Sequence, residues 1–250
     1  MLVSLQDSLD ELKGKFAFTG IVDHEESWKS LFGKKDPKIV YAELSQGLTG
    51  DVKVTLSGNN NLLKLEIRRY DTENAHLLSE SVITFSNQFH TSTIEDVQVF
   101  EGHKSGIART IIKNVSKLWD EFGTKKIDVN AGKSVGGYAW LRFGFLPGNI
   151  PDLKAYVTKK ITPELEAQHP KTIEYVKLAM STGRPEAFRF ISGLQAAVMI
   201  EDKNGEQVNL KVGQALLLGS NWKGNLDLNN PTSRQMLNDY INTKPKGLAL

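Results

Sequence analysis

The sequence contains no cysteine, which excludes disulfide bonds, thiolate nucleophiles and cysteine-bound zinc. Its five histidines are isolated, because no two of them stand four residues apart and no carboxylate spacing typical of a metal site accompanies them. We therefore expect no metal centre.

Long apolar runs and strong net charge are also missing. No run of about 18 apolar residues occurs, and no basic segment followed by an apolar one stands at the N-terminus, so we expect neither a membrane span nor secretion, and a cytoplasmic location. The formal net charge is +2 and the lysines are scattered, so nucleic-acid binding is not indicated. Of the 250 residues, 40% are hydrophobic, which suffices for one large domain or a domain plus an extension.

The first 38 residues predict a helix followed by an irregular segment. Apolar residues recur at helical spacing, at Leu2, Leu5, Leu9, Leu12 and Phe16. The polar face of this helix is acidic, whereas binding to anionic lipid requires lysine, so we expect a helix docked on the protein surface. The segment that follows, through Asp36 and Pro37, shows no clear period, and domain-like patterning begins at Ile39.

Residues 39–100 favour β-structure. Alternating or β-branched runs predict strands over 52–56, 62–70, 78–85 and 91–100. Short polar turns separate these runs, which favours antiparallel pairing of neighbours.

The stretch from Val97 to Pro147 predicts strand, glycine turn, helix, strand, glycine turn, helix and strand. Apolar residues at helical spacing predict a helix over 107–122 with one buried face, and Gly123 marks its end. Alternation over 126–130 predicts the next strand. Antiparallel strands followed by this strand and helix order predict an α+β fold.

The first glycine turn is the candidate ligand site. Gly102 and Gly106 let the backbone approach a ligand closely. The unpaired amides at a helix start, with the positive end of the helix dipole, hold an anion such as a pyrophosphate. Lys104 and Arg109 add positive charge nearby. A tight turn that binds nothing is the alternative interpretation.

The segment 131–134, Ala-Gly-Lys-Ser, ends as the phosphate-binding loop of nucleoside triphosphatases does. That loop requires a further glycine five residues before Gly132, and Ile127 occupies this position. The amide cradle depends on the missing glycine, so we do not expect a nucleotide site here.

The segment 103–108, His-Lys-Ser-Gly-Ile-Ala, resembles a known signature, Gln/Arg-x-x-Gly-x-Gly/Ala. This is the acetyl-CoA signature of the GNAT superfamily of N-acetyltransferases. Further along, the segment 135–147, Val-Gly-Gly-Tyr-Ala-Trp-Leu-Arg-Phe-Gly-Phe-Leu-Pro, resembles its last helix running into its Gly-Phe strand. The amino-acid sequence of the second motif is similar to that in acetyltransferase-like proteins of phages and prophages. The final hundred residues carry no such resemblance.

The resemblance implies a mixed, mostly antiparallel central sheet flanked by helices over residues 39–158. It also implies binding of acetyl-CoA and transfer of the acetyl group, by direct attack, to an amine on a small molecule or a protein. The family's cofactor-binding positions correspond to His103, Lys104, Ser105, Gly106, Ile107, Ala108 and Arg109. Glu101 and Asn130, near the ends of the two central strands, are candidates for holding the amine or its water, with a turn or cap role as the alternative.

The chain departs from the family pattern at two positions. His103 replaces the usual Gln or Arg of the signature, and Trp140 replaces the tyrosine that acts as general acid. Indole cannot protonate a departing thiolate. Tyr138 lies two residues earlier, about 200° round an ideal helix, so it supplies the acid only if the Gly136-Gly137 start of the helix is irregular. Packing against the strands is its alternative role.

Residues 159–250 predict an extra C-terminal unit of helices and a hairpin. Helix starts or breaks are marked by Thr162, Pro163, Pro170, Pro185 and Pro231. Asn204-Gly205 between two β-runs predicts the hairpin. Nothing in the unit indicates a reaction, and its apolar residues suggest a contact with the core or with a protein partner. A non-catalytic phage structural or host-interaction protein, in the host cytoplasm or the virion, is therefore the alternative to an acetyltransferase.

Overall fold

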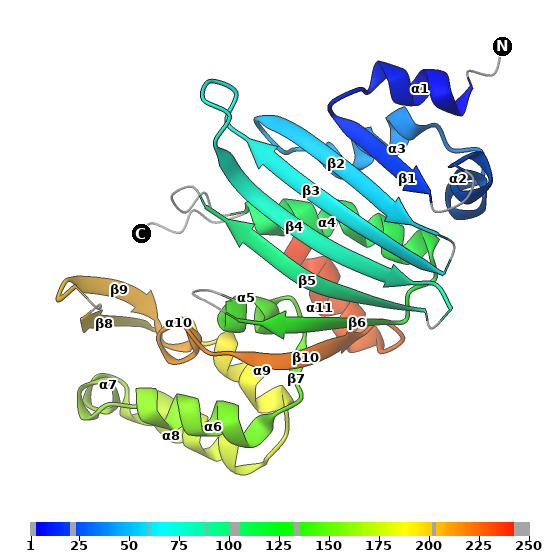
Figure 1. Cartoon of the computed structure of the whole chain (residues 1–250). Coiled ribbons are helices and arrows are strands. Elements are labelled where there is room, and N and C mark those ends of the chain that lie inside the picture. Colours follow the sequence, from blue (N-terminus) through cyan, green and yellow to red (C-terminus); the bar gives the residue numbers. More distant parts are fainter. Residues whose placement is uncertain are drawn as a thin grey trace. The chain divides into compact units, whose positions relative to one another are not determined.

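The computed structural model describes residues 4–20, 24–59, 61–88, 90–100, 106–132, 136–201 and 204–242 (Figure 1). The chain divides into two compact units. The first contains residues 1–127 and 241–247, and the second contains residues 128–240 and 248–250. The domain boundaries expected at 38/39 and 158/159 stay a prediction.

The N-terminal segment is more regular than its sequence predicts. Helix α1 (Leu5–Glu11) confirms a helix near the N-terminus, with the Ser4 hydroxyl accepting from the Asp7 amide. It ends earlier than expected, because Phe16, which the sequence interpretation placed on this helix, lies in the strand that follows. The segment expected to be irregular instead forms strand β1 (Phe16–Gly20) and helix α2 (His24–Phe32). Both are stabilised by tertiary packing: Phe16 and Phe18 contact the buried Trp28 edge to face, with ring centroids 6.0 and 5.3 Å away.

Helix α3 (Pro37–Ser45) also corrects the sequence interpretation, which placed Asp36 and Pro37 in a loop and the residues after Ile39 in β-structure. The Asp36 carboxylate accepts a hydrogen bond from the Lys38 amide at 2.8 Å, and Pro37 occupies the first helical position. Proline is tolerated there because the first amides of a helix have no partner within it. The Asp-Pro pair is therefore a helix start.

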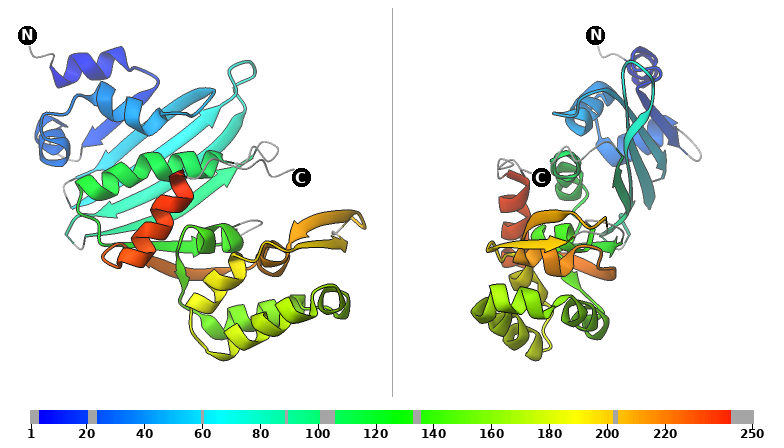
Figure 2. Two further views of the ribbon diagram at one scale, coloured as in Figure 1. Left: turned by 180° about the vertical axis from the view of Figure 1, so that it is seen from behind. Right: turned by 90° about the vertical axis from the view of Figure 1, so that its left-hand side faces the viewer.

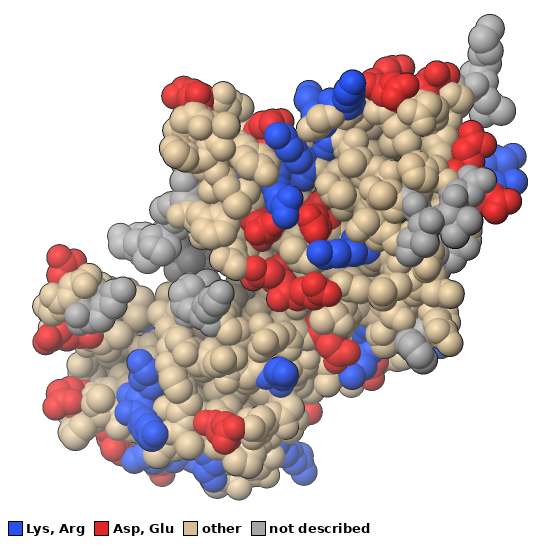
Figure 3. All heavy atoms as spheres, viewed as in Figure 1, with Lys and Arg blue, Asp and Glu red and all other residues tan. Residues whose placement is uncertain are grey.

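The predicted antiparallel strands are confirmed. They are β2 (Asp51–Gly58), β3 (Leu62–Tyr70), β4 (Leu77–Ser86) and β5 (Thr91–Val99). In the first unit the order is β1-β2-β3-β4-β5, with β1 parallel to β2 and the later neighbours antiparallel. One face is apolar and buried. The other carries charges of both signs (Figure 3), including the ion pairs Lys64–Glu66 at 2.7 Å and Arg68–Glu80 at 2.6 Å.

Helix α4 (Ile107–Glu121) packs with α3 on the buried face of these strands (Figure 2, left). Its stripe of buried residues, from Ile111 to Trp119, is the one that the sequence predicts. The Asn114 amide donates to the carbonyl oxygens of Leu44 and Gln46, both at 2.9 Å, and the Trp119 indole donates to Ser92 Oγ at 3.1 Å. These buried polar contacts fix how α4 lies against α3 and β5.

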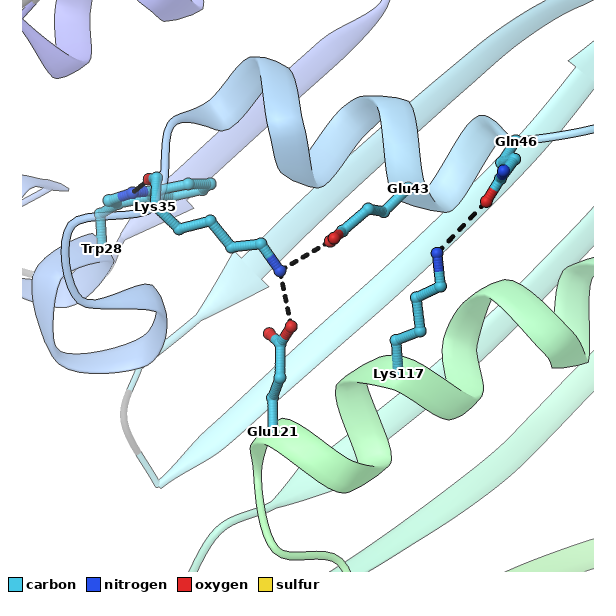
Figure 4. A network of polar contacts seen from close by, with 6 residues as sticks. All are labelled: Trp28, Lys35, Glu43, Gln46, Lys117 and Glu121. Carbon is cyan, nitrogen blue, oxygen red and sulfur yellow. Dashed lines mark hydrogen bonds and ion pairs between the residues drawn. The ribbon is translucent and has the colours of Figure 1, made fainter.

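An ion-pair network joins α4 to α3 (Figure 4). Lys35 Nζ lies 2.6 Å from the Glu43 carboxylate and 2.5 Å from that of Glu121. Partial burial acts to lower the pKa of the Lys35 ammonium, but the hydrogen bonds and charges of Glu121 and Glu43 outweigh it and raise that pKa. Near it, Lys117 Nζ donates to Gln46 Oε1 at 3.2 Å.

The second unit is built on three strands in the order β6-β10-β7. Strand β6 (Lys126–Ala131) crosses the boundary between the units, and β7 (Leu146–Pro147) follows helix α5 (Gly136–Arg142). Strand β10 (Trp222–Asp227) comes from far along the chain and pairs antiparallel with β7, with Asn225 opposite Leu146. The sequence did not predict this strand.

The remaining elements of the second unit lie between β7 and the end of the described chain. They are α6 (Ile150–Lys160), α7 (Pro163–Gln168), α8 (Pro170–Ser181), α9 (Glu186–Ser192), β8 (Ala197–Glu201), β9 (Gln207–Lys211), α10 (Val212–Leu217) and α11 (Pro231–Asn242). The Thr162 cap, the break at Pro170 and the hairpin β8–β9 are confirmed. Helices α6 and α10 were not predicted.

The α+β fold class is confirmed, with a mostly antiparallel sheet and flanking helices. None of the described helices is long and apolar enough to cross a membrane.

Candidate functional site

The junction between β5 and α4 contains the glycine on which the anion-site prediction depends. Gly106 is the N-cap of α4 and has φ +116°, a backbone conformation that side chains with a Cβ rarely adopt. Among the described residues, no side chain caps the helix there, and no acidic residue lies in its first turn. The Thr110 amide and hydroxyl both turn back to the Gly106 carbonyl oxygen, at 2.8 and 3.0 Å.

Ile107, Ala108 and Arg109 precede Thr110, the first residue of α4 whose amide is bonded within the described part of this helix end. By the geometry of any helix start, the amides of Ile107 and Ala108 have no carbonyl partner within the helix. Together with the dipole of a 15-residue helix, they give this end a partial positive charge. Gly106 and these three residues are all partly exposed. This local geometry suits the binding of an anion.

Four of the candidate residues fall outside the described part of the chain. They are Glu101, His103, Lys104 and Ser105. The Lys133-Ser134 segment of the rejected nucleotide pattern lies outside it as well. Gly106, Ile107, Ala108 and Arg109 belong to the first unit, whereas Asn130 and Tyr138 belong to the second.

Asn130 is exposed near the end of β6, and its carbonyl oxygen accepts from the Gly132 amide at 3.0 Å. A neighbour that the sequence did not predict is Asn221, at the start of β10. A Cβ placed on Gly132 would lie 3.5 Å from Asn221 Oδ1. The C-terminal segment thus contributes a polar side chain beside the loop that follows β6.

Helix α5 is regular from Gly136, within the residues that the structure describes. The irregular start that would let Tyr138 take the place of Trp140 is therefore not observed. The glycines have another explanation: a Cβ on Gly137 would lie 1.9 Å from Ser220 Oγ and 2.6 Å from the Ser220 carbonyl oxygen. Gly137 is required for close packing of α5 against the segment before β10.

Trp140 is a core residue, with 7% of its surface exposed. Its ring contacts Phe143 and Phe145, each with centroids 5.2 Å away. Tyr138 is half-buried, and this burial raises the pKa of its hydroxyl, an effect that the positive charge of Arg142 partly opposes. The phenol consequently keeps its proton at neutral pH.

The end of α5 and the Gly-Phe turn are held by α9. Arg142 Nη1 donates to the Ser192 carbonyl oxygen at 3.3 Å, and Arg189 Nη2 donates to the carbonyl oxygen of Gly144. Gly144 has φ +98°, which explains the glycine of the motif. The sequence did not predict these contacts, because Arg189 lies far from the motif along the chain.

Comparisons with known proteins give little further information. No protein-family model and no curated protein matches the chain. Among solved structures, the crystal structure of nourseothricin acetyltransferase resembles part of it, with a TM-score of 0.30 and 18% identity. The match covers 36% of this chain and 52% of that one, so the chain spans about half the length of the protein it matches. At this TM-score the likeness bears on neither activity nor cofactor.

Proposed function

We propose that this protein binds acetyl-CoA and transfers its acetyl group to an amine. The observation that carries the proposal is the start of α4, where Gly106 adopts φ +116° without a side-chain cap or an acidic residue in the first turn. Such a helix start suits the pyrophosphate of CoA, which needs backbone amides and a positive field.

Two further features support the same interpretation. The residues of the signature resemblance, from His103 to Ala108, include the start of α4. The second motif forms a helix and a short strand, α5 and β7, in the order that the resemblance implies. A tight turn with no ligand explains the conformation of Gly106 equally well, but it gives no reason for the second motif.

The roles proposed for individual residues are those that the resemblance implies. The amides of residues 106–109, with His103, Lys104 and Ser105, hold the phosphates. Glu101 and Asn130 are proposed to hold the amine or its water, so that a neutral nitrogen attacks. Acetyl-CoA supplies the activated thioester, and the departing thiolate takes up a proton. Tyr138 has a proton to give at neutral pH, but the regular start of α5 favours packing as its role.

The transfer reaction can be tested with a thiol reagent, because the chain contains no cysteine to interfere. Acetyl-CoA is incubated with the protein and a panel of primary amines, from polyamines and aminoglycosides to peptides with free amino groups. We expect free CoA thiol to appear only when protein and a suitable amine are both present. If no amine in the panel raises thiol release above the protein-free rate, transfer is contradicted while CoA binding remains to be measured separately.

A further inference from the structure

The hairpin β8–β9 is a sheet of two strands, with no further strand beside it in the described residues. Its register places Val198 opposite Leu210 and Ile200 opposite Val208. Just beyond the strands, the Val212 amide donates to the Ala196 carbonyl oxygen at 2.8 Å. Two-stranded sheets are marginally stable in water, so the edges of this hairpin are informative about what it contacts.

The alternation of an antiparallel pair shows which backbone groups face outward. Ala196 and Val212 form a hydrogen-bonded pair, and in an antiparallel ladder every second residue is bonded in the same way. The even-numbered residues of β8 and β9 therefore direct their N–H and C=O groups toward the other strand of the hairpin. The odd residues of β8 point the other way, where Ala197 O accepts from His169 Nε2 at 2.7 Å and Met199 O from Gln168 Nε2 at 3.4 Å. The outer edge of β8 is thus covered by side chains at the end of α7.

The outer edge of β9 has no such cover in the part of the chain that the structure describes. The backbone N–H and C=O groups of Gln207 and Asn209 and the N–H of Lys211 face outward along it, and the side chains of Gln207 and Asn209 are exposed. The C=O of Lys211, the N-cap of α10, accepts the first bond of that helix. An uncovered edge of this kind is a template for another strand.

We propose that β9 pairs, antiparallel and about a twofold axis through Asn209, with β9 of a second copy of this chain. An antiparallel edge is self-complementary about such an axis. Asn209 then faces Asn209, and Gln207 faces Lys211, so each of the three outward-facing residues finds a partner. The result is a four-stranded sheet made of two hairpins.

The register and the charges favour this pairing. Centring the axis on Val208 instead would bring Lys211 opposite Gly205, which lies in the turn with φ +83° and not in a strand. Centring it on Asn209 uses the whole length of β9. No like charges then meet across the axis, because Lys211 faces the neutral Gln207. The apolar residues Val208 and Leu210 also continue as one row with those of the second hairpin.

Because the native chain has no cysteine, a single introduced cysteine can form a disulfide only with its copy in a second chain. In the proposed pairing two copies of residue 209 form a hydrogen-bonded pair, with Cα atoms about 5.5 Å apart, within reach of a disulfide. Two copies of residue 207 lie about 13 Å apart, since four residues separate them along the strand. Neither Asn209→Cys nor Gln207→Cys removes a β8–β9 hydrogen bond.

We expect the full-length Asn209→Cys variant to give about ten-fold more covalent dimer than Gln207→Cys under mild oxidation, and the wild type to scatter light as a dimer. Asn209→Pro, which removes an outward amide only, should return the chain to a monomer. Equal crosslinking of the two cysteine variants, or a wild type that is monomeric at concentrations of about 100 µM, would overturn the proposal. A monomer that binds an added extended peptide along β9 would also overturn it, in favour of a different partner.

Discussion

Helices α4 and α5 each have glycine at or near their start, and the two glycines are needed for different reasons. Gly106, before α4, is needed for its backbone conformation, with φ +116°. Gly137, in α5, is needed because Ser220 packs where its Cβ would be. Neither helix has an acidic side chain in its first turn, but the first has 15 residues, whereas the second has seven and its glycine meets another part of the protein. This difference is why we propose the anion site at α4 and not at α5.

The largest effect should come from removing the segment that packs against α5. A chain ending at Thr158 lacks β10, Ser220 and the Arg189 hydrogen bond to Gly144. Its exposed apolar surface should make it aggregate or lose cooperative unfolding in urea. The control is a chain ending at Asn242, which keeps every described residue. A soluble 1–158 fragment that binds CoA would show that the C-terminal segment is a separate module.

Adding a methyl group to each glycine of α5 tests the packing explanation. Gly137→Ala should destabilise the fold by about 2 kcal/mol, because the added carbon overlaps Ser220. The matched control is Gly136→Ala, whose added carbon would have no neighbour closer than 3.7 Å and should change stability by about 0.5 kcal/mol or less. Urea unfolding measures both. Equal effects at the two positions would mean that close packing is not what Gly137 provides.

Removing the phenol of Tyr138 tests whether α5 takes part in the reaction. Because α5 is regular, we expect Tyr138→Phe to change kcat by less than about threefold with a responsive amine, and to leave CoA affinity unchanged. A loss of about 100-fold in kcat alone would instead identify Tyr138 as the proton donor.

The smallest effect concerns the ion pairs at the other end of α4. Lys35→Gln should cost about 0.5 kcal/mol at neutral pH, since the Lys35 network is partly exposed. Because the folded state raises the pKa of Lys35, its contribution is present below about pH 10.5 and is lost as the pH rises through the folded value. The variant should therefore lose less stability than the wild type when urea unfolding is followed from about pH 9 to about pH 12. Identical alkaline profiles would contradict this role.

The local sequence pattern predicted most strands of the first unit, but not the pairing of distant strands in the second unit. Strands β2 to β5 follow one another and pair with their neighbours, so alternation and turn residues suffice to predict them. Strand β10 has Gly224 near its centre and no clear alternation, and its pairing with β7 gives the reason: a Cβ there would lie 2.1 Å from the Leu146 carbonyl oxygen. A contact between residues so far apart along the chain leaves no local signal.

The candidate site divides in the same way. The amphipathic α4 was predicted. Glycine at 106 was expected to allow close approach of a ligand, whereas its positive φ was not predicted. The contacts of Gly137 with Ser220 and of Gly132 with Asn221 depend on where β10 lies, so they could not be predicted. The early elements β1 and α2 were missed because their aromatic residues are stabilised by packing against one another and carry no period long enough to recognise.

The most direct test of the account is calorimetric titration of acetyl-CoA into three full-length proteins: the wild type, Gly106→Val and Gly183→Val. Valine at a positive φ is strained at both positions, but Gly183, with φ +66° and no described atom within 4 Å of an added Cβ, lies between α8 and α9 in the second unit, whereas α4 belongs to the first. We predict that the wild type and Gly183→Val bind alike, and that Gly106→Val binds at least about ten-fold more weakly, a loss of about 1.4 kcal/mol. A wild type that does not bind at about 1 mM acetyl-CoA, or a Gly106→Val protein that binds as well as the wild type, would contradict the placement of the cofactor at α4.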